Sequence, residues 1–376
     1  MQPKAARNIS IEALRLVAVA GIAVFHTFQW TFQATCAGLP EYAPLAAFPY
    51  SGVLGFINLL GCWANEVFFM ISGYFLIASA ARAWDGGATW KSQMQRTAQR
   101  LGKVVMPTTF YCLVALAWST AVSPIPDVTL NTHYWYTLGL EFIWVYAATV
   151  FMAPWFGLAK SRLSQKSCTA TVIAVGILAF VVNGYLAAMS TTSAGEFSWL
   201  QKLMSAATYV IAFLIGGLLR NVTGAMDSDK TGTLGMRSLV TVLVLATILE
   251  GTLSFTGNLT AMAALSYKST SLISFALAAA SLLFAATRRS ASGNPRTAGV
   301  IATLSTATLG FYVMQSLTSS LWRPVFNTLL ANILVSQNSP AATCIITGTV
   351  ISIVFALALL IIDTARSLIV RKLKRQ

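Results

Sequence analysis

Residues 9–32 of the chain read ISIEALRLVAVAGIAVFHTFQWTF, an apolar run that contains one arginine, Arg15, and one histidine, His26. A run of about 20 mostly apolar residues is long enough to cross a bilayer as a helix. At about 100° and 1.5 Å per residue, the two side chains fall on one face, roughly 16 Å apart. Because ionisable groups are rare in such segments and often functional, we interpret this face as the lining of a pocket.

The rest of the chain is similarly apolar. Of its 376 residues, 56% are hydrophobic and 10% are charged, and the mean hydropathy is +0.69. Soluble proteins carry about 25% charged residues, and outer-membrane barrels show short alternating segments, so the pattern favours a helical membrane protein. Apolar segments are predicted at 9–32, 53–80, 104–122, 134–158, 168–188, 200–219, 237–256, 269–287, 300–322 and 342–364. We therefore predict an all-α, polytopic bundle of about ten transmembrane helices, with residues 1–376 as one domain.

The basic residues indicate how this bundle is oriented. Of the 25 lysines and arginines, 21 fall in alternate connections and at the two termini. The other side holds Lys202, Lys268 and Arg323, and Arg15 lies within the first segment. Because cytoplasmic loops carry the excess of Lys and Arg, this bias predicts that both termini are cytoplasmic.

Two regions near the second and third segments carry polar groups. The second segment contains Glu66 and the small residues Ser72 and Gly73, which allow another backbone or a ligand to approach closely. Further on, Arg96, Arg100 and Lys103 share one helical face at positions i, i+4 and i+7. Two interpretations of this basic face stay open, a phosphate-binding surface and an amphipathic helix that faces lipid headgroups.

The remaining candidates lie further along the chain. His133 and Trp135 fall at the predicted outer interface, where an aromatic belt is the simpler explanation, and Glu141 follows within the membrane. Tyr312 and Gln315 share a helical face in the ninth segment, which helix packing explains as well as a site does. Neither the two histidines nor the five scattered cysteines show metal-ligand spacing, so no metal is expected.

Four motifs in this order make the chain resemble the integral-membrane acyltransferase 3 family. They are residues 7–15 (RNISIEALR) followed by His26, residues 68–74 (FFMISGY), residues 96–107 (RTAQRLGKVVMP) and residues 136–141 (YTLGLE). Glu12 stands where the family usually has an aspartate, and Gln315 stands where many members have a histidine.

The resemblance implies an O-acyltransferase of the bacterial inner membrane. Such a protein commonly moves acetyl from cytoplasmic acetyl-CoA, a donor substrate and not a bound cofactor, to hydroxyls of envelope or exported polysaccharide. His26 is then a general base or a transient acyl carrier, and Glu66 or Glu141 orients it. Arg15 supports donor binding, with Arg96, Arg100, Lys103, Ser72, Gly73 and Tyr74. The acceptor side is assigned to His133, Trp135, Tyr312 and Gln315.

Three alternatives to an O-acetyltransferase are open from the sequence. Arg15, His26, Glu66, Glu141 and Glu250 could form the path of a proton-coupled secondary transporter. The chain could instead be a scaffold or export partner in polysaccharide assembly, without chemistry of its own. Among enzymes, succinyl transfer is an alternative to acetyl transfer.

Overall fold

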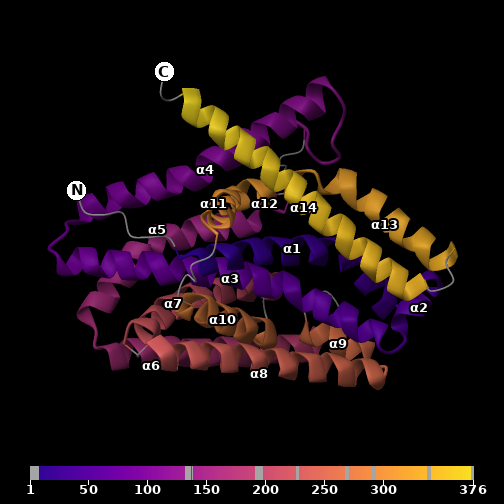
Figure 1. Ribbon diagram of the computed structural model, residues 1–376, viewed down its shortest axis with the longest axis horizontal. Coiled ribbons are helices and arrows are strands. Elements are labelled where there is room, and N and C mark those ends of the chain that lie inside the picture. Colours follow the sequence, from indigo (N-terminus) through magenta and orange to yellow (C-terminus); the bar gives the residue numbers. More distant parts are fainter. Residues whose placement is uncertain are drawn as a thin grey trace.

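The computed structural model describes residues 8–131, 137, 139–190, 198–225, 228–266, 271–288, 294–336 and 340–373, and the regular elements in these ranges are all helices (Figure 1). The long helices are α1 (Ile9–Cys36), α3 (Tyr50–Asp85), α4 (Trp90–Ala121), α5 (Glu141–Arg162), α6 (Gln165–Ser190), α7 (Ser198–Ala225), α8 (Ser228–Phe255) and α14 (Pro340–Leu373). The shorter elements are η1 (Pro40–Tyr42), α2 (Ala43–Ala46), α9 (Leu259–Leu265), α10 (Leu272–Thr287), α11 (Pro295–Leu304), η4 (Ser305–Ala307), α12 (Thr308–Leu317) and α13 (Ser319–Ser336).

The described helices agree with the prediction of a polytopic membrane bundle. Nine helical stretches in this part of the chain are long and apolar enough to cross a membrane, and α10 is a shorter apolar helix. Each of the ten predicted segments falls on one of them. The protein is therefore a multi-pass membrane protein.

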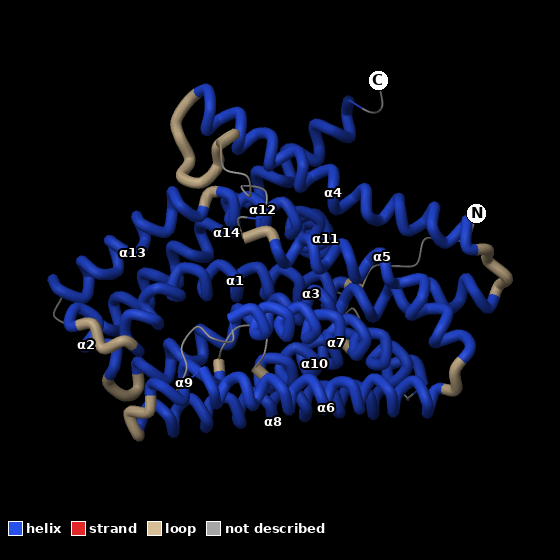
Figure 2. Tube along the Cα trace, turned by 180° about the vertical axis from the view of Figure 1, so that it is seen from behind, coloured by secondary structure: helices blue, strands red, loops and turns tan. Residues whose placement is uncertain are grey.

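The helices α1 and α3 occupy the middle of the bundle. Helix α3 packs against α1, α5, α7 and α10. Small residues permit the close approach to α7, because a Cβ atom on Gly73 would overlap the carbonyl oxygen of Phe213 and one on Gly216 would overlap that of Met70. Figures 1 and 2 show α6 and α8 along one side of this pair and α4 and α14 along the other.

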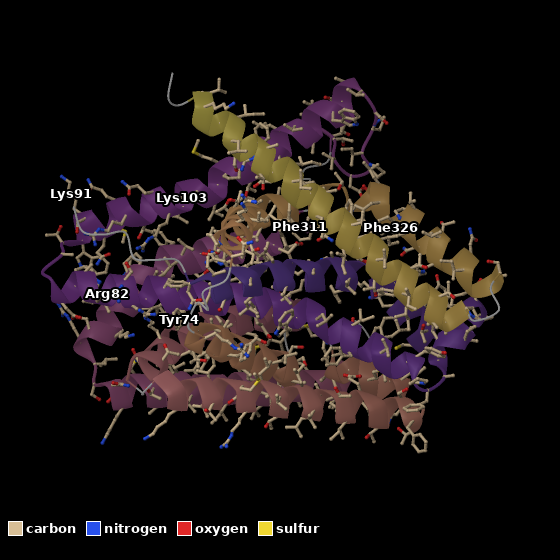
Figure 3. All side chains as sticks on the ribbon, in the orientation of Figure 1. Tyr74, Arg82, Lys91, Lys103, Phe311 and Phe326 are labelled. Carbon is tan, nitrogen blue, oxygen red and sulfur yellow. The ribbon has the colours of Figure 1, made fainter. Side chains whose placement is uncertain are left out.

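Successive membrane helices alternate in direction. The start of α1 and the end of α14 consequently lie toward the same end of the bundle, as both views show. Lys91 and Lys103 of α4 and Arg82 of α3 lie toward that end as well (Figure 3). The connections that contain most of the basic residues of the chain therefore lie toward one end of the bundle.

Three features differ from the predicted segments. Helix α4 begins at Trp90 and continues through Pro107, so the basic stretch belongs to the membrane helix itself. The ninth segment is interrupted, because η4 separates α11 from α12. Helix α13, which contains Pro324, extends well beyond the predicted ninth segment, because only its residues 319–322 fall within 300–322.

Candidate active site

A first cavity, of about 360 Å³, gathers basic side chains between α1, α3, α4, α5 and the interrupted segment. We call it the basic cavity. Its lining is Arg15, Ile22, Phe68, Ser72, Leu76, Arg100, Lys103, Val104, Phe142, Ile143, Tyr146, Val150, Ser305, Thr306, Thr308, Leu309, Phe311 and Tyr312. Three of these side chains are cationic and none is acidic, so the cavity favours an anionic ligand.

Local contacts hold two of these cations in place. The guanidinium of Arg15 forms an ion pair of 2.9 Å with Glu12, one helical turn earlier. The side chain of Asn8 caps α1 by accepting from the backbone N–H groups of Ser10 and Ile11. On α4, Arg100 donates to the hydroxyl of Ser79 at 3.2 Å. Neither contact uses all five N–H donors of a guanidinium, so both residues retain donors for a ligand.

The interruption of the ninth segment faces the basic cavity. Ser305, Thr306 and Thr308 line it, and Thr308 is the first residue of α12. Broken membrane helices are tolerated where they line a cavity, and they often bind substrate there. The polar run of residues 303–308 (TLSTAT) was the signal for this break in the sequence.

A second cavity, of about 430 Å³, contains His26. We call it the histidine cavity. Its lining is His26, Gly139, Glu141, Phe142, Val145, Lys202, Ser205, Ala206, Tyr209, Tyr312, Ser316, Ser319 and Arg323. It combines polar groups of both charges with two tyrosines, a mixture that suits a polar ligand with stacking faces, such as a sugar.

His26 has two partners, and both contact the same ring nitrogen. The guanidinium of Arg323 approaches Nδ1 at 3.1 Å, and Oε1 of Gln29 lies 3.4 Å from Nδ1. A guanidinium can only donate, so the contact with Arg323 requires a lone pair on Nδ1 and a proton on Nε2. Gln29 Oε1 can only accept, so it favours the opposite tautomer, in which Nε2 has the lone pair. The two neighbours therefore compete for the tautomer of His26.

Phe142 of α5 and Tyr312 of α12 line both cavities. Their ring centroids are 4.7 Å apart. Phe142 also makes an edge contact with Tyr209, whose ring stacks on Phe69 at 4.6 Å. These rings form an aromatic layer where the basic cavity and the histidine cavity meet.

Arg15 and His26 lie in different cavities. The predicted face of α1 is present, and Ile22, between them on that face, also lines the basic cavity. Arg15 faces the basic cavity and His26 faces the histidine cavity. The single pocket expected along this face is therefore divided by the aromatic layer.

Only part of the predicted donor set lines the basic cavity. Arg100, Lys103 and Ser72 do, and the hydroxyl of Ser72 hydrogen-bonds to that of Tyr146 at 2.9 Å. Arg96 is exposed on another part of α4 and does not line it.

Gly73 and Tyr74, which follow Ser72 in the motif of residues 68–74, face α7. Gly73 packs on Phe213, and the hydroxyl of Tyr74 contacts Arg220 and Thr223 at 2.9 Å each. Neither lines the basic cavity. Their side of α3 serves helix packing.

Of the residues predicted to orient His26 or to bind the acceptor, some line the histidine cavity and others do not. Glu141, the first residue of α5, and Tyr312 line the histidine cavity. Glu66 is fully buried, and its carboxylate has no hydrogen-bond partner among the described residues. Glu66 and Gln315 line neither cavity. His133 and Trp135 fall outside the described residues.

Sequence reasoning missed the basic residues of the histidine cavity. Lys202 and Arg323 both line it. A signal was present, because these are two of only three basic residues assigned to the sparsely charged side of the membrane. Nothing in the sequence pairs Arg323 with His26, since 297 positions separate them. Among the described residues, no three His, Cys, Asp or Glu side chains gather as a metal site.

Comparison with known proteins gives one match. The model of the acyltransferase 3 family, described as an acyltransferase domain, matches residues 8–359. No curated protein and no solved structure matches the chain. The matched range contains Arg15, His26, Arg323 and both cavities, and covers nearly the whole chain. The protein is a membrane acyltransferase and belongs to the acyltransferase 3 family.

Proposed function

We propose that the protein is an O-acyltransferase of the bacterial inner membrane that moves acetyl from cytoplasmic acetyl-CoA to a hydroxyl of an envelope or exported polysaccharide. The observation that carries this proposal is the aromatic boundary: a basic cavity and a histidine cavity share Phe142 and Tyr312. An anionic donor held on one side of these rings can present its acyl end to an acceptor held on the other.

The distribution of charge supports this orientation. The lysines and arginines of the chain are concentrated in the connections at the end where both termini lie. Cytoplasmic surfaces carry that excess. We therefore assign this end, toward which Arg15 and Lys103 lie, to the cytoplasm. The donor then enters from the compartment that contains acyl-CoA.

The basic cavity suits the phosphates of the donor. Arg15, Arg100 and Lys103 supply three cations, and Arg forms bidentate contacts with phosphate oxygens. The apolar part of the lining, with Phe68 and Leu76, suits the neutral pantetheine arm. Glu12 orients Arg15 for this task through its ion pair.

His26 is the group that we assign to the chemical step. In the tautomer that Gln29 favours, Nε2 takes the proton of the acceptor hydroxyl while the oxygen attacks the thioester carbonyl. The new C–O bond forms, the C–S bond breaks, and the proton passes to the departing thiolate. The products are an O-acetyl ester and free CoA. In the alternative, Nε2 attacks the thioester itself and carries the acetyl group transiently.

Arg323 has a different role in this scheme. While it donates to Nδ1, Nε2 holds a proton and His26 cannot act as a base. The Nε atom of Arg323 is buried and has no partner among the described residues. We propose that Arg323 leaves Nδ1 when substrates bind and donates to the oxyanion that develops on the thioester carbonyl. Donors placed at such an oxyanion contribute about 10²–10³ in kcat.

The lining of the histidine cavity also indicates which acceptor and which acyl group fit there. Tyr209 and Tyr312 offer faces for a sugar ring, and Glu141 and Lys202 offer hydrogen bonds to hydroxyls. Lys202 could also pair with the free carboxylate of a succinyl group, which keeps succinyl transfer as an alternative. The transporter alternative has less support, because the buried carboxylate of Glu66 lines neither cavity.

The test compares the ester content of surface glycan in the wild-type host, a deletion strain, and strains with His26→Ala or Arg15→Ala. Protein abundance is measured by immunoblot. We expect base-labile acetyl ester to be lost in the deletion and His26→Ala strains and reduced with Arg15→Ala. Unchanged ester in the deletion strain would rule out glycan acylation in that host. Unchanged ester with His26→Ala alone would favour a scaffold.

A further inference from the structure

A third polar cavity, of about 350 Å³, lies between α3, α5, α6 and α7. Its charged lining residues are Arg82 and Asp85 of α3, Lys160 of α5 and Arg220 of α7. Figure 3 shows Arg82 near the end of α3, in the half of the molecule where the chain ends lie. We call this space the α3–α7 pocket. We infer that the α3–α7 pocket binds a phosphate group and is a site separate from the basic cavity.

Two of the three cations are held in position by neutral groups. Lys160 donates to the side-chain oxygen of Asn221 at 2.6 Å. Arg220 donates to the hydroxyl of Tyr74 at 2.9 Å and lies over its ring, with 4.9 Å between guanidinium and ring centroid. Such partners orient a cation without neutralising it. Oriented but unneutralised cations are what an anion-binding site requires.

The described residues leave this pocket with an excess of positive charge. The ion pairs in the described part of the chain are Arg15–Glu12 and Arg366–Asp363. Asp85 lines the pocket together with Arg82 but forms no ion pair with it among these residues. Three cations thus face one carboxylate. Two guanidinium groups and an ammonium group favour phosphate, whose oxygens accept several charge-assisted hydrogen bonds at once.

The α3–α7 pocket shares no lining residue with the basic cavity, and α3 and α5 pack tightly against each other beside it. Gly157 of α5 lies so close to Ala80 and Ala81 of α3 that an added Cβ atom would overlap Ala80. On α3, Ser72 and Leu76 line the basic cavity, whereas Ala78, Ala81 and Arg82 line the pocket. The α3–α7 pocket is therefore a space distinct from the basic cavity.

A phosphate group could reach this position from two sources. The pocket lies at the end of the bundle that we assign to the cytoplasm, where anionic lipid headgroups lie at the membrane surface. Soluble phosphate compounds are present at the same surface. Binding by a protein whose pocket residues are all unchanged distinguishes a ligand site from an internally neutralised cluster.

The experiment uses the full-length protein in two kinds of nanodisc at low salt. In phosphatidylcholine discs, inorganic pyrophosphate is titrated and followed by calorimetry. In phosphatidylcholine discs with one quarter phosphatidylglycerol, native mass spectrometry counts the phosphatidylglycerol molecules that stay bound. All proteins carry Arg100→Gln and Lys103→Gln, which remove two cations of the basic cavity. The result therefore does not depend on whether the basic cavity binds acetyl-CoA.

On this background, Arg82→Gln is the main test variant, because the side chain of Arg82 is exposed and makes no hydrogen bond or ion pair among the described residues. Arg82→Gln with Arg220→Gln is the stronger variant. The matched control is Arg162→Gln with Arg237→Gln, two exposed cations of α5 and α8 outside the pocket. Each removed guanidinium should weaken binding roughly tenfold, the value of one charge-assisted contact.

Each outcome has a defined meaning. Pyrophosphate binding that falls with Arg82→Gln and not with the control identifies a site for soluble phosphate. Retention of phosphatidylglycerol that shows the same dependence, without pyrophosphate binding, identifies a headgroup site. If neither probe binds the parent protein, or if the pocket variants match the control, the inference is wrong.

Discussion

The basic cavity and the histidine cavity share two aromatic side chains and differ in almost everything else. The lining of the basic cavity contains three cations and no carboxylate, and local contacts hold two of those cations, Arg15 and Arg100, in place. The histidine cavity presents both signs of charge around one imidazole whose two partners favour opposite tautomers. The first arrangement is suited to binding and the second to a proton transfer. Substitutions in the two cavities should therefore affect different kinetic constants.

The largest effect should come from His26→Ala. Loss of a general base or nucleophile should lower kcat by about 10²–10⁴. Acetyl-CoA should bind as before, because the cations that we assign to its phosphates line the basic cavity and not the histidine cavity. Transfer is measured with purified protein and isolated acceptor glycan, and acetyl-CoA binding by calorimetry. Gln33→Ala, on an exposed position of the same helix, is the control. An equal loss of acetyl-CoA affinity with His26→Ala would contradict the division of roles.

The next effect concerns the basic cavity. Arg100→Gln with Lys103→Gln should weaken acetyl-CoA binding by about 10–100-fold, because each cation contributes a charge-assisted contact. The loss should appear in KM and shrink at high salt, with kcat at saturation nearly unchanged. Arg96→Gln removes a cation of the same helix that does not line the cavity, and should behave like the wild type. If Arg96→Gln weakens binding as much, general surface charge explains the effect.

A smaller effect should follow from Gln29→Leu. This change removes the acceptor that favours the active tautomer of His26 and leaves Arg323 in contact with Nδ1. We expect kcat to fall roughly tenfold, the value of about one hydrogen bond, with KM for acetyl-CoA unchanged. Gln33→Leu is the matched control. An unaltered kcat in Gln29→Leu would show that Gln29 does not select the tautomer.

The smallest effect should be a change in acyl preference. Phe142→Leu reduces the ring layer between the cavities, so a longer acyl chain should be accommodated better. The ratio of butyryl to acetyl transfer should rise by a few-fold up to about tenfold, at or below the low end of the roughly 10–200-fold that one methylene contributes in a closed apolar pocket. Phe151→Leu changes an exposed ring of the same helix and is the control. A ratio that moves equally in both variants would falsify the role of Phe142 as a boundary.

The sequence predicted the architecture and the first helix well for a simple physical reason. Segment length, apolarity and helical periodicity are local properties, so the ten segments and the shared face of Arg15 and His26 follow from residues close together in the chain. The division of that face into two cavities cannot be derived from residues close together in the chain. It depends on Phe142 and Tyr312, which come from helices far along the chain.

The donor motif around Ser72 shows a second limit. Its residues are adjacent in sequence, yet Ser72 lines the basic cavity while Gly73 and Tyr74 face α7. Successive residues of a helix point in different directions, so one motif can serve both a site and a packing surface. Arg323 could not be assigned to His26 from sequence, since only the tertiary fold brings α13 beside α1.

We propose that acetyl crosses from a cytoplasmic donor cavity to an acceptor at His26. The most direct test supplies acetyl-CoA labelled in its acetyl group to sealed inside-out and right-side-out membrane vesicles that contain the natural acceptor. We predict labelled ester on glycan in inside-out vesicles only, and none when the membranes carry His26→Ala. Equal labelling in both orientations, or undiminished labelling with His26→Ala, would contradict the account.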